Sequence, residues 1–253
     1  MKQPDIKFSI ITVVFNAAQI LEKTILSVIS QTYRFIEYII IDGGSNDGTV
    51  SVIRRYQGGV KYWISEPDEG LYDAMNKGLQ AATGDYVCFL NAGDRFQHHR
   101  IIAELAAIAE RENTPDILYG ETNLIDATGR VFARRRLKAP RRLTWKSFRM
   151  GMVVCHQAFI VKRSLAPEYD RQYRFSADFD WCIRCLKTAY TIVNTRLRLV
   201  YYLYEGATTA NRKASLKERY DIMCQYYGKR PTQIRHIWFA IRFYWAKIFR
   251  NNS

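Results

Sequence analysis

The chain has 253 residues, of which 48% are apolar and 14% aromatic, so it can bury a sizeable core and is neither disordered nor fibrous. Lysine and arginine number 38 against 24 aspartates and glutamates, a formal net charge of +14. Five cysteines are too sparse, and odd in number, for a disulfide scaffold, which favours a reducing compartment.

The first 120 residues alternate between strand-like and helix-like stretches. Short β-branched runs predict strands at 8–15, 38–42, 60–64, 86–90 and 117–119, and the residues between them predict helices at 17–31, 49–56, 71–82 and 100–112. This order indicates βαβ units and an α/β fold with a mainly parallel sheet covered on both faces. Ligands of such sheets bind beyond the carboxyl ends of the strands. Four polar residues follow predicted strands there: Asn16, Asp42, Glu66 and Asn91.

The pattern loosens after Gly120. A basic hairpin is predicted at 131–138, strands at 158–161 and 197–204, and helices at 178–186, 215–227 and 232–250. We find no internal repeat and no flexible linker, so this half is expected to complete the same domain. No apolar run reaches the roughly 18–20 residues that cross a bilayer, and the run at 8–15 fits a strand better than a signal peptide. The sequence therefore predicts a cytoplasmic protein.

Positive charge is concentrated in two segments. Residues 127–150 contain nine basic side chains and no acidic one, and residues 211–253 contain ten basic and two acidic ones. Such segregation indicates that these parts of the chain face a polyanion, which could be nucleic acid, anionic lipid or a phosphorylated substrate.

Two acidic loops follow the early strands. The turn DGGSNDGT, at 42–49, has neither the glycine spacing of a dinucleotide-binding loop nor the lysine of a P-loop. Its first carboxylate could accept hydrogen bonds from a base or ribose, or the segment could be an ordinary βα turn. In EPDEGLYDAMNKG, at 66–78, Asp68 and Glu69 could cap a helix, and the face shared by Asp73, Asn76 and Lys77 could be a solvated one.

Two further segments carry carboxylates. Asn91 and Asp94, in FLNAGD, end the fourth predicted strand with oxygen-bearing side chains, which Mg²⁺ and Mn²⁺ prefer. In SADFDW, one carboxylate would cap the predicted helix, and the other could act as a general base. We interpret Cys182 and Cys185 as core residues and the isolated His156 as a packed polar residue.

Taken in order, FSIITVVFN, IIIDGGSNDGT, EPDEGLYDAMNKG, FLNAGD and SADFDW resemble the family 2 glycosyltransferases over roughly residues 8–186. These are inverting, nucleotide-sugar-dependent enzymes with the GT-A fold, a Rossmann-like sheet flanked by helices. The resemblance implies a transferase domain over 1–210, with a nucleotide-sugar half at about 1–120 and an acceptor half at about 121–210, followed by a basic helical extension at 211–253. The form of the third motif implies the branch that builds bacterial exopolysaccharides such as colanic acid, or O-antigen.

The resemblance also implies roles for single residues. Asp178 would be the catalytic base and Asp94 would bind the metal–diphosphate, with Mn²⁺ or Mg²⁺ as cofactor. Asp42 would accept from a uracil-type imide, which favours a UDP-sugar. The donor would be bound by a larger set: Phe15, Asn16, Asp42, Asp68, Tyr72, Asn76, Lys77 and Asn91. Candidates on the acceptor side are His156, Gln157 and Asp180.

The sequence departs from the family pattern in places. Gly93 stands where the family has its usual metal ligand, so either Asp94 takes over or metal dependence is reduced. Ala177 replaces the glutamate of the usual Glu-Asp pair. The Q-x-x-R-W element of processive synthases is absent, which favours transfer of a single sugar.

The last predicted helix is amphipathic. Its apolar face is Ile234, Ile237, Trp238, Ile241, Tyr244, Trp245 and Ile248, with Arg235, Arg242 and Arg250 roughly opposite and Lys247 flanking them. Such a helix could pack on the core or lie on an anionic membrane. The second option suits a polyprenyl-diphosphate-linked saccharide acceptor and a peripheral location on the inner face of the cell membrane.

Two other functions are alternatives to a glycosyltransferase. One is a basic nucleic-acid-binding protein, although no recognition motif is present and no nucleic acid is expected as partner. The other is a different nucleotide-using enzyme, such as a nucleotidyltransferase.

Overall fold

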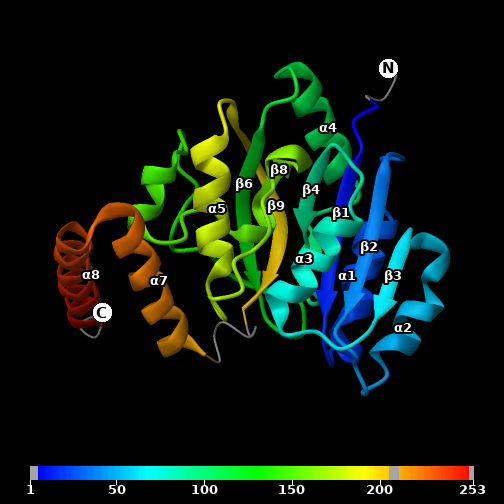
Figure 1. The fold of residues 1–253 in the computed structure, drawn as a ribbon, viewed down its shortest axis with the longest axis horizontal. Coiled ribbons are helices and arrows are strands. Elements are labelled where there is room, and N and C mark those ends of the chain that lie inside the picture. Colours follow the sequence, from blue (N-terminus) through cyan, green and yellow to red (C-terminus); the bar gives the residue numbers. More distant parts are fainter. Residues whose placement is uncertain (1–4, 205–210, 251–253) are drawn as a thin grey trace.

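The computed structural model describes residues 5–204 and 211–250 (Figure 1). For Arg212 and residues 240–250 it describes the backbone and not the side chains. In this part of the chain nine strands form one sheet. Its order is β3 (Tyr62–Ser65), β2 (Ile36–Asp42), β1 (Phe8–Val14), β4 (Tyr86–Phe89), β8 (Phe159–Lys162), β6 (Ile117–Ile125), β9 (Ile192–Leu203) and β5 (Arg95–Phe96), and β7 (Val131–Arg134) pairs with β6.

The sheet is mainly parallel, as predicted. β3, β2, β1 and β4 run parallel to one another, and β6 runs parallel to β9. β8 lies antiparallel between β4 and β6 and joins the two parallel halves, while β5 and β7 pair antiparallel at β9 and β6. The carboxyl ends of β1 and β4 therefore meet the end of β9 across one edge of the sheet.

Helices cover both faces of the sheet (Figure 1). Every residue of β1 is buried, and alternate residues enter two separate cores. One core lies under α1 (Ala18–Ile29), α2 (Thr49–Arg55) and α4 (Ile101–Arg111). The other lies under α3 (Leu71–Ala81) and α5 (Ala177–Thr188). This two-sided burial explains why the early strands are continuous apolar runs.

Two helices follow β9 in the described part of the chain, with α7 (Arg212–Tyr227) on the α5 side of the molecule and α8 (Lys229–Arg250) beyond α7 (Figure 1). α7 places Ile222, Met223 and Tyr227 in the core shared with α5. Gly228, with φ of 86°, separates α7 from α8. The basic segment thus begins on a helix packed into the domain. Within the described residues, no helix combines the length and the apolar character needed to span a membrane.

Candidate active site

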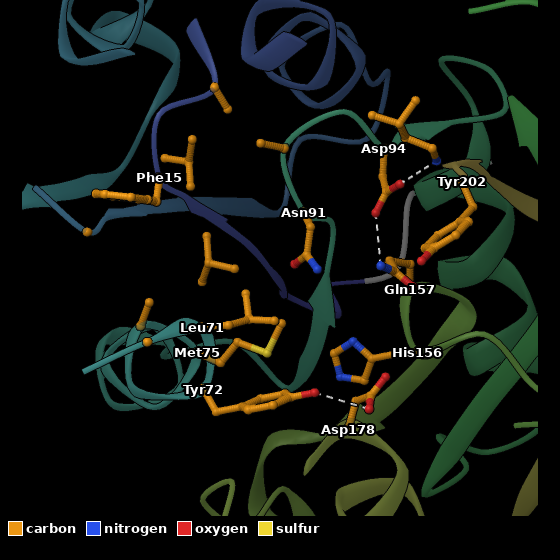
Figure 2. Close-up of a pocket in the computed structure, with 18 of the residues that line it drawn as sticks. Phe15, Leu71, Tyr72, Met75, Asn91, Asp94, His156, Gln157, Asp178 and Tyr202 are labelled. Atoms are coloured by element: carbon orange, nitrogen blue, oxygen red, sulfur yellow. Dashed lines mark hydrogen bonds between the residues drawn. The ribbon is translucent and has the colours of Figure 1, made fainter. Parts of the chain in front are cut away.

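A cavity of about 900 Å³ opens where β1 and β4 end, between the start of α3, the first turn of α5 and the end of β9 (Figure 2). The cavity thus lies at the edge of the sheet where the strand-end rule predicts a ligand, and Asn16 and Asn91 line it, whereas Asp42 and Glu66 do not. Its lining includes nine residues predicted from the sequence: Phe15, Asn16, Asp68, Tyr72, Asn91, Asp94, His156, Gln157 and Asp178. Four predicted residues, Asp42, Asn76, Lys77 and Asp180, are not part of the lining.

One end of the cavity is formed by the turn after β1. The side chain of Phe15 is 63% exposed, which is unusual for a large apolar ring and leaves its face free for a planar ligand. Asn16 adopts a φ of 48°, and its Oδ1 accepts a hydrogen bond from the Asn46 backbone N–H at 3.0 Å. Asn16 thereby ties this turn to the 42–49 loop.

Asp42 lies beneath that loop and is fully buried. Its carboxylate accepts hydrogen bonds from the Ser45 backbone N–H at 3.0 Å and from the Ser65 hydroxyl at 2.6 Å. Asp42 therefore stabilises the 42–49 loop and does not line the cavity, whereas the resemblance implied that it binds the base.

Asn76 and Lys77 are not part of the cavity lining, and their side chains make other contacts. The amide of Asn76 donates to the Tyr169 backbone carbonyl at 3.0 Å and accepts from the Tyr169 backbone N–H at 2.7 Å. Lys77 pairs with Glu66 at 2.8 Å. Asn76 and Lys77 thus make structural contacts in this structure, whereas the resemblance implied that they bind the donor.

We expect Asn76→Ala to lower the free energy of unfolding by about 1–3 kcal/mol, because two buried backbone groups of Tyr169 lose their partners. Urea denaturation of the two proteins measures this loss. The affinity for a nucleoside diphosphate, measured on folded protein, should stay within about twofold. A large loss of affinity with unchanged stability would restore the donor-binding assignment.

Asp94 lines the cavity in the loop after β4 and is 3% exposed (Figure 2). Its Oδ2 accepts from the Gln157 amide at 2.9 Å, and its Oδ1 accepts from the Leu203 backbone N–H at 2.8 Å. Burial raises the pKa of Asp94 to about 7, against the opposing effect of these two hydrogen bonds. The carboxyl is therefore held by protein donors on both oxygens.

The neighbouring Gly93 supplies no metal ligand, and its backbone conformation disfavours any side chain. Its φ is 95°, and a Cβ placed on it would lie 2.5 Å from Cδ2 of Leu203 and 3.2 Å from Cδ1 of Ile20. Across the described ranges, no three His, Cys, Asp or Glu side chains gather into a group that could hold a metal ion. A divalent cation on this side of the cavity would therefore have to rely on Asp94, whose two oxygens already accept protein hydrogen bonds.

The raised pKa of Asp94 makes stability depend on pH. Because the folded-state pKa lies above the ordinary value of 3.8, the native state binds this proton more tightly than the unfolded state, and stability should fall as pH rises from about 4 to about 7. We expect Asp94→Asn to remove this component. Chemical denaturation of both proteins across that range measures it, and parallel curves would contradict the prediction.

Asp178 lies in the first turn of α5 and faces the cavity (Figure 2). Its Oδ1 accepts from the Tyr72 hydroxyl at 3.2 Å and from the Phe179 backbone N–H at 2.9 Å. Burial, reinforced by the charge of Asp178, raises the pKa of Tyr72 well above its ordinary value, so the phenol keeps its proton. Among the described residues, the other oxygen of Asp178 has no hydrogen-bond donor from the protein. The carboxylate is thus oriented through one oxygen, with the second left for a substrate.

The remaining predicted residues are divided between the cavity and the core. His156 lines the cavity, and its Nε2 lies 2.6 Å from the Tyr169 hydroxyl; burial lowers its pKa to about 4, so the ring is neutral at neutral pH. Asp180 is buried outside the lining, where it pairs with Arg184 at 2.6 Å and accepts from the Tyr226 hydroxyl at 2.7 Å. Its contacts are structural, which differs from the predicted acceptor-side role.

Three basic residues of the cavity lining were not predicted from the sequence. Arg135, Arg174 and Arg219 line the cavity, and they come from the basic segment at 127–150, the loop before α5 and the helix α7. The basic composition of 127–150 was visible, but nothing in the sequence indicates which of its nine cations turns inward.

Comparison with known proteins gives consistent results. The sequence model for glycosyl transferase family 2 matches residues 9–169. An uncharacterized glycosyltransferase of Mycobacterium tuberculosis is 35% identical over 181 residues, covering 70% of this chain and 67% of that protein. The amylovoran biosynthesis glycosyltransferase AmsB of Erwinia amylovora is 28% identical over 210 residues, covering 78% and 70%.

Solved structures agree on the fold. S. aureus TarS in complex with UDP-GlcNAc superimposes with a TM-score of 0.68 at 19% identity, covering 86% of this chain and 64% of that one. The mannosyltransferase of Pyrobaculum calidifontis in complex with GDP-Man and Mn²⁺ gives a TM-score of 0.63 at 15% identity, covering 89% and 65%. The fold is therefore that of GT-A glycosyltransferases, and one neighbour of this fold carries a divalent cation.

Proposed function

The chain belongs to glycosyl transferase family 2, and on this premise we propose that it transfers one sugar, with inversion, from a nucleoside-diphosphate sugar to a hydroxyl of a lipid-linked saccharide in bacterial surface polysaccharide synthesis. Relatives include a polysaccharide-biosynthesis enzyme, and a structural neighbour binds UDP-GlcNAc, which favours a UDP-sugar as donor. The observation that carries the proposal is the oriented carboxylate of Asp178 in the cavity.

The proposed reaction is a single displacement. One oxygen of Asp178 takes the proton of the acceptor hydroxyl as that oxygen attacks the anomeric carbon. The bond from this carbon to the diphosphate breaks on the opposite face, and the nucleoside diphosphate leaves with the electron pair. Tyr72 holds the carboxylate in place through Oδ1. General-base assistance of this kind typically contributes about 10²–10⁴-fold.

The part of the cavity beyond the ends of β1 and β4 is suited to the donor. The exposed ring of Phe15 offers a face for a nucleobase. Oδ1 of Asn91 is buried in the lining without a hydrogen-bond partner among the described residues, so it can accept from a donor hydroxyl. A nucleotide at Phe15 and a base at Asp178 place the sugar between them.

A thermal-shift screen of UDP-, GDP- and dTDP-sugars, followed by assays of nucleoside-diphosphate release, tests the proposal. We expect at least one UDP-sugar to raise the melting temperature and to be consumed when membrane lipids are added as a source of acceptor. Absence of any shift with every nucleotide-sugar, together with salt-sensitive RNA binding, would favour the nucleic-acid alternative.

We also propose that α8 rests on an anionic membrane at the inner face of the cell, where a polyprenyl-linked acceptor would be found. Ile234, Ile237 and Trp238 are 68%, 62% and 46% exposed. The side chains of Ile241, Tyr244, Trp245 and Ile248, and of Arg242, Lys247 and Arg250, lie outside the described residues. Exposed apolar side chains on a basic helix favour binding at a lipid interface.

The buried Thr232 hydroxyl donates to the Met223 carbonyl of α7 at 3.1 Å. Removing α8 would break this contact, so point variants test membrane binding better than truncation. The double variant Ile234→Asn/Ile237→Asn should bind anionic liposomes at least about tenfold more weakly in a sedimentation assay, since two apolar side chains lose their burial in lipid. Val131→Asn, an exposed apolar change on β7, is the matched control. Unchanged liposome binding by the double variant would contradict the membrane proposal.

A further inference from the structure

The cavity lining contains three arginines that form no direct ion pair, alongside the carboxylates of Asp68, Glu69, Asp94 and Asp178. These arginines are Arg135, Arg174 and Arg219, and none is within ion-pair distance of a carboxylate in the described part of the chain. Two arginines that do not line the cavity do form ion pairs with carboxylates. Arg171 pairs with Asp73 at 2.5 Å, and Arg184 pairs with Asp180 at 2.6 Å. Unpaired guanidinium groups in a concave site indicate an anionic ligand.

Arg135 lies on the side of the cavity formed by β6, β7 and β9, where the Leu203 backbone N–H binds Asp94. It follows β7, and its Nη2 donates to the Met152 backbone carbonyl at 2.7 Å. Cys155 and Tyr202, which line the cavity, are within electrostatic reach of Arg135, Asp94 and Asp178. One anchored nitrogen leaves the other N–H groups of the guanidinium fork for a ligand. The fork is therefore positioned by the backbone rather than by a carboxylate.

A nucleoside diphosphate that departs from a sugar needs its growing charge offset. A divalent cation would require ligands beside the diphosphate, but each oxygen of Asp94 already accepts a protein hydrogen bond, and position 93 is a glycine with a φ of 95° that side chains rarely adopt. A guanidinium can supply both the charge and paired hydrogen bonds to phosphate oxygens.

We infer that Arg135 binds the diphosphate of the donor and stabilises it as it leaves, in place of a carboxylate-held divalent cation. This inference rests on the proposed transferase function. Arg219 lies near Tyr72, and its Nε is buried without a hydrogen-bond partner among the described residues. A diphosphate on the incoming lipid-linked acceptor is therefore a second possible anion, and the experiment separates it by omitting the acceptor.

Calorimetric titration of the full chain with UDP, first in EDTA and then with Mn²⁺, tests the inference. We expect the two dissociation constants to agree within about threefold. Arg135→Gln should weaken UDP binding about tenfold to a hundredfold in EDTA, as expected for loss of a charged hydrogen-bonding group, and Arg135→Lys should lie between. Arg136→Gln, the same change at the exposed neighbouring position, is the matched control and should bind normally.

Uridine lacks the diphosphate, so it distinguishes the loss of a diphosphate contact from a disturbed fold. If Arg135 contacts the diphosphate, wild type and Arg135→Gln should bind uridine with equal affinity. UDP binding that requires Mn²⁺, or that Arg135→Gln leaves unchanged, would overturn the inference while leaving the proposed function intact. Equal weakening of UDP and uridine would also overturn it, because the residue would then support the fold. A wild-type protein that binds no UDP, GDP or dTDP in either buffer would overturn the inference and the proposed function together.

Discussion

Asp178→Asn is expected to lower turnover by about 10²–10⁴-fold while leaving the affinity for donor nucleotide nearly unchanged. Asparagine keeps an oxygen that can accept from the Tyr72 hydroxyl and from the Phe179 backbone N–H, so the side chain should hold its position. It has no group that can take the proton of an acceptor hydroxyl at neutral pH. The rate of nucleoside-diphosphate release and calorimetric UDP titration measure the two quantities separately.

The matched control for this prediction is two residues further along α5. Asp180→Asn makes the same chemical change, but at a buried carboxylate that pairs with Arg184 and accepts from Tyr226 outside the cavity. It should reduce stability and leave the turnover of folded protein close to normal. Near-normal turnover by Asp178→Asn would remove Asp178 from the role of base.

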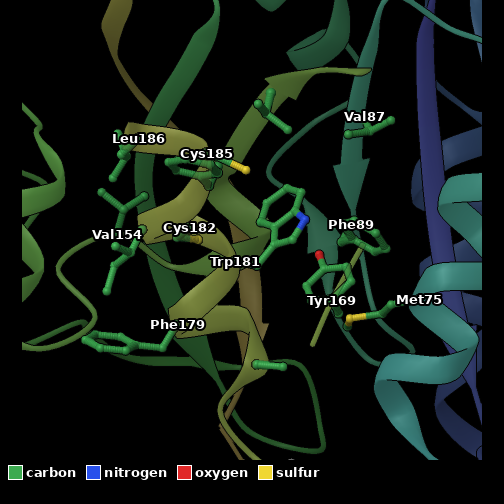
Figure 3. Close-up of a cluster of buried hydrophobic side chains, with 14 of the residues drawn as sticks. Met75, Val87, Phe89, Val154, Tyr169, Phe179, Trp181, Cys182, Cys185 and Leu186 are labelled. Atoms are coloured by element: carbon green, nitrogen blue, oxygen red, sulfur yellow. The ribbon is translucent and has the colours of Figure 1, made fainter. Parts of the chain in front are cut away.

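Trp181→Ala should have the largest effect on stability, lowering the free energy of unfolding by about 3–5 kcal/mol. The indole is completely buried between α5 and β4 (Figure 3). Its ring stacks on Tyr169 with centroids 5.0 Å apart, and its Nε1 donates to the Pro167 backbone carbonyl at 2.6 Å. The ring also touches His156, so its loss removes support for one wall of the cavity.

Urea denaturation followed by circular dichroism measures this loss. Trp181→Phe is the control, since it keeps an aromatic ring in the core and gives up the hydrogen bond and part of the volume, and its loss should be clearly smaller. A loss below about 1 kcal/mol for Trp181→Ala would show that the cluster does not hold α5 against the sheet.

The parallel half of the fold could be predicted because burial on both faces leaves a clear pattern. β1 and β2 are continuous apolar runs, and the helices between strands show a single apolar face. β5 has only two residues, too few for a pattern, and β6 extends to Ile125 because it pairs with β9, a strand far along the chain. Such pairing depends on long-range contacts that local periodicity does not contain.

The site divides in the same way. The strand-end rule brought Asn16, Asn91 and Asp94 to one cavity, because the ends of parallel strands share an edge. It could not tell that Asn76 is not part of the lining and binds the backbone of Tyr169. The arginines of the cavity could not be predicted either, because they come from three segments that are far apart in the sequence.

The anomeric configuration of the first sugar product, followed in real time by NMR with the donor found in the screen, tests the central claim most directly. If Asp178 activates the acceptor on the face opposite the leaving diphosphate, the product must carry the configuration opposite to that of the donor. A product that keeps the configuration of the donor would contradict the single displacement and the role given to Asp178.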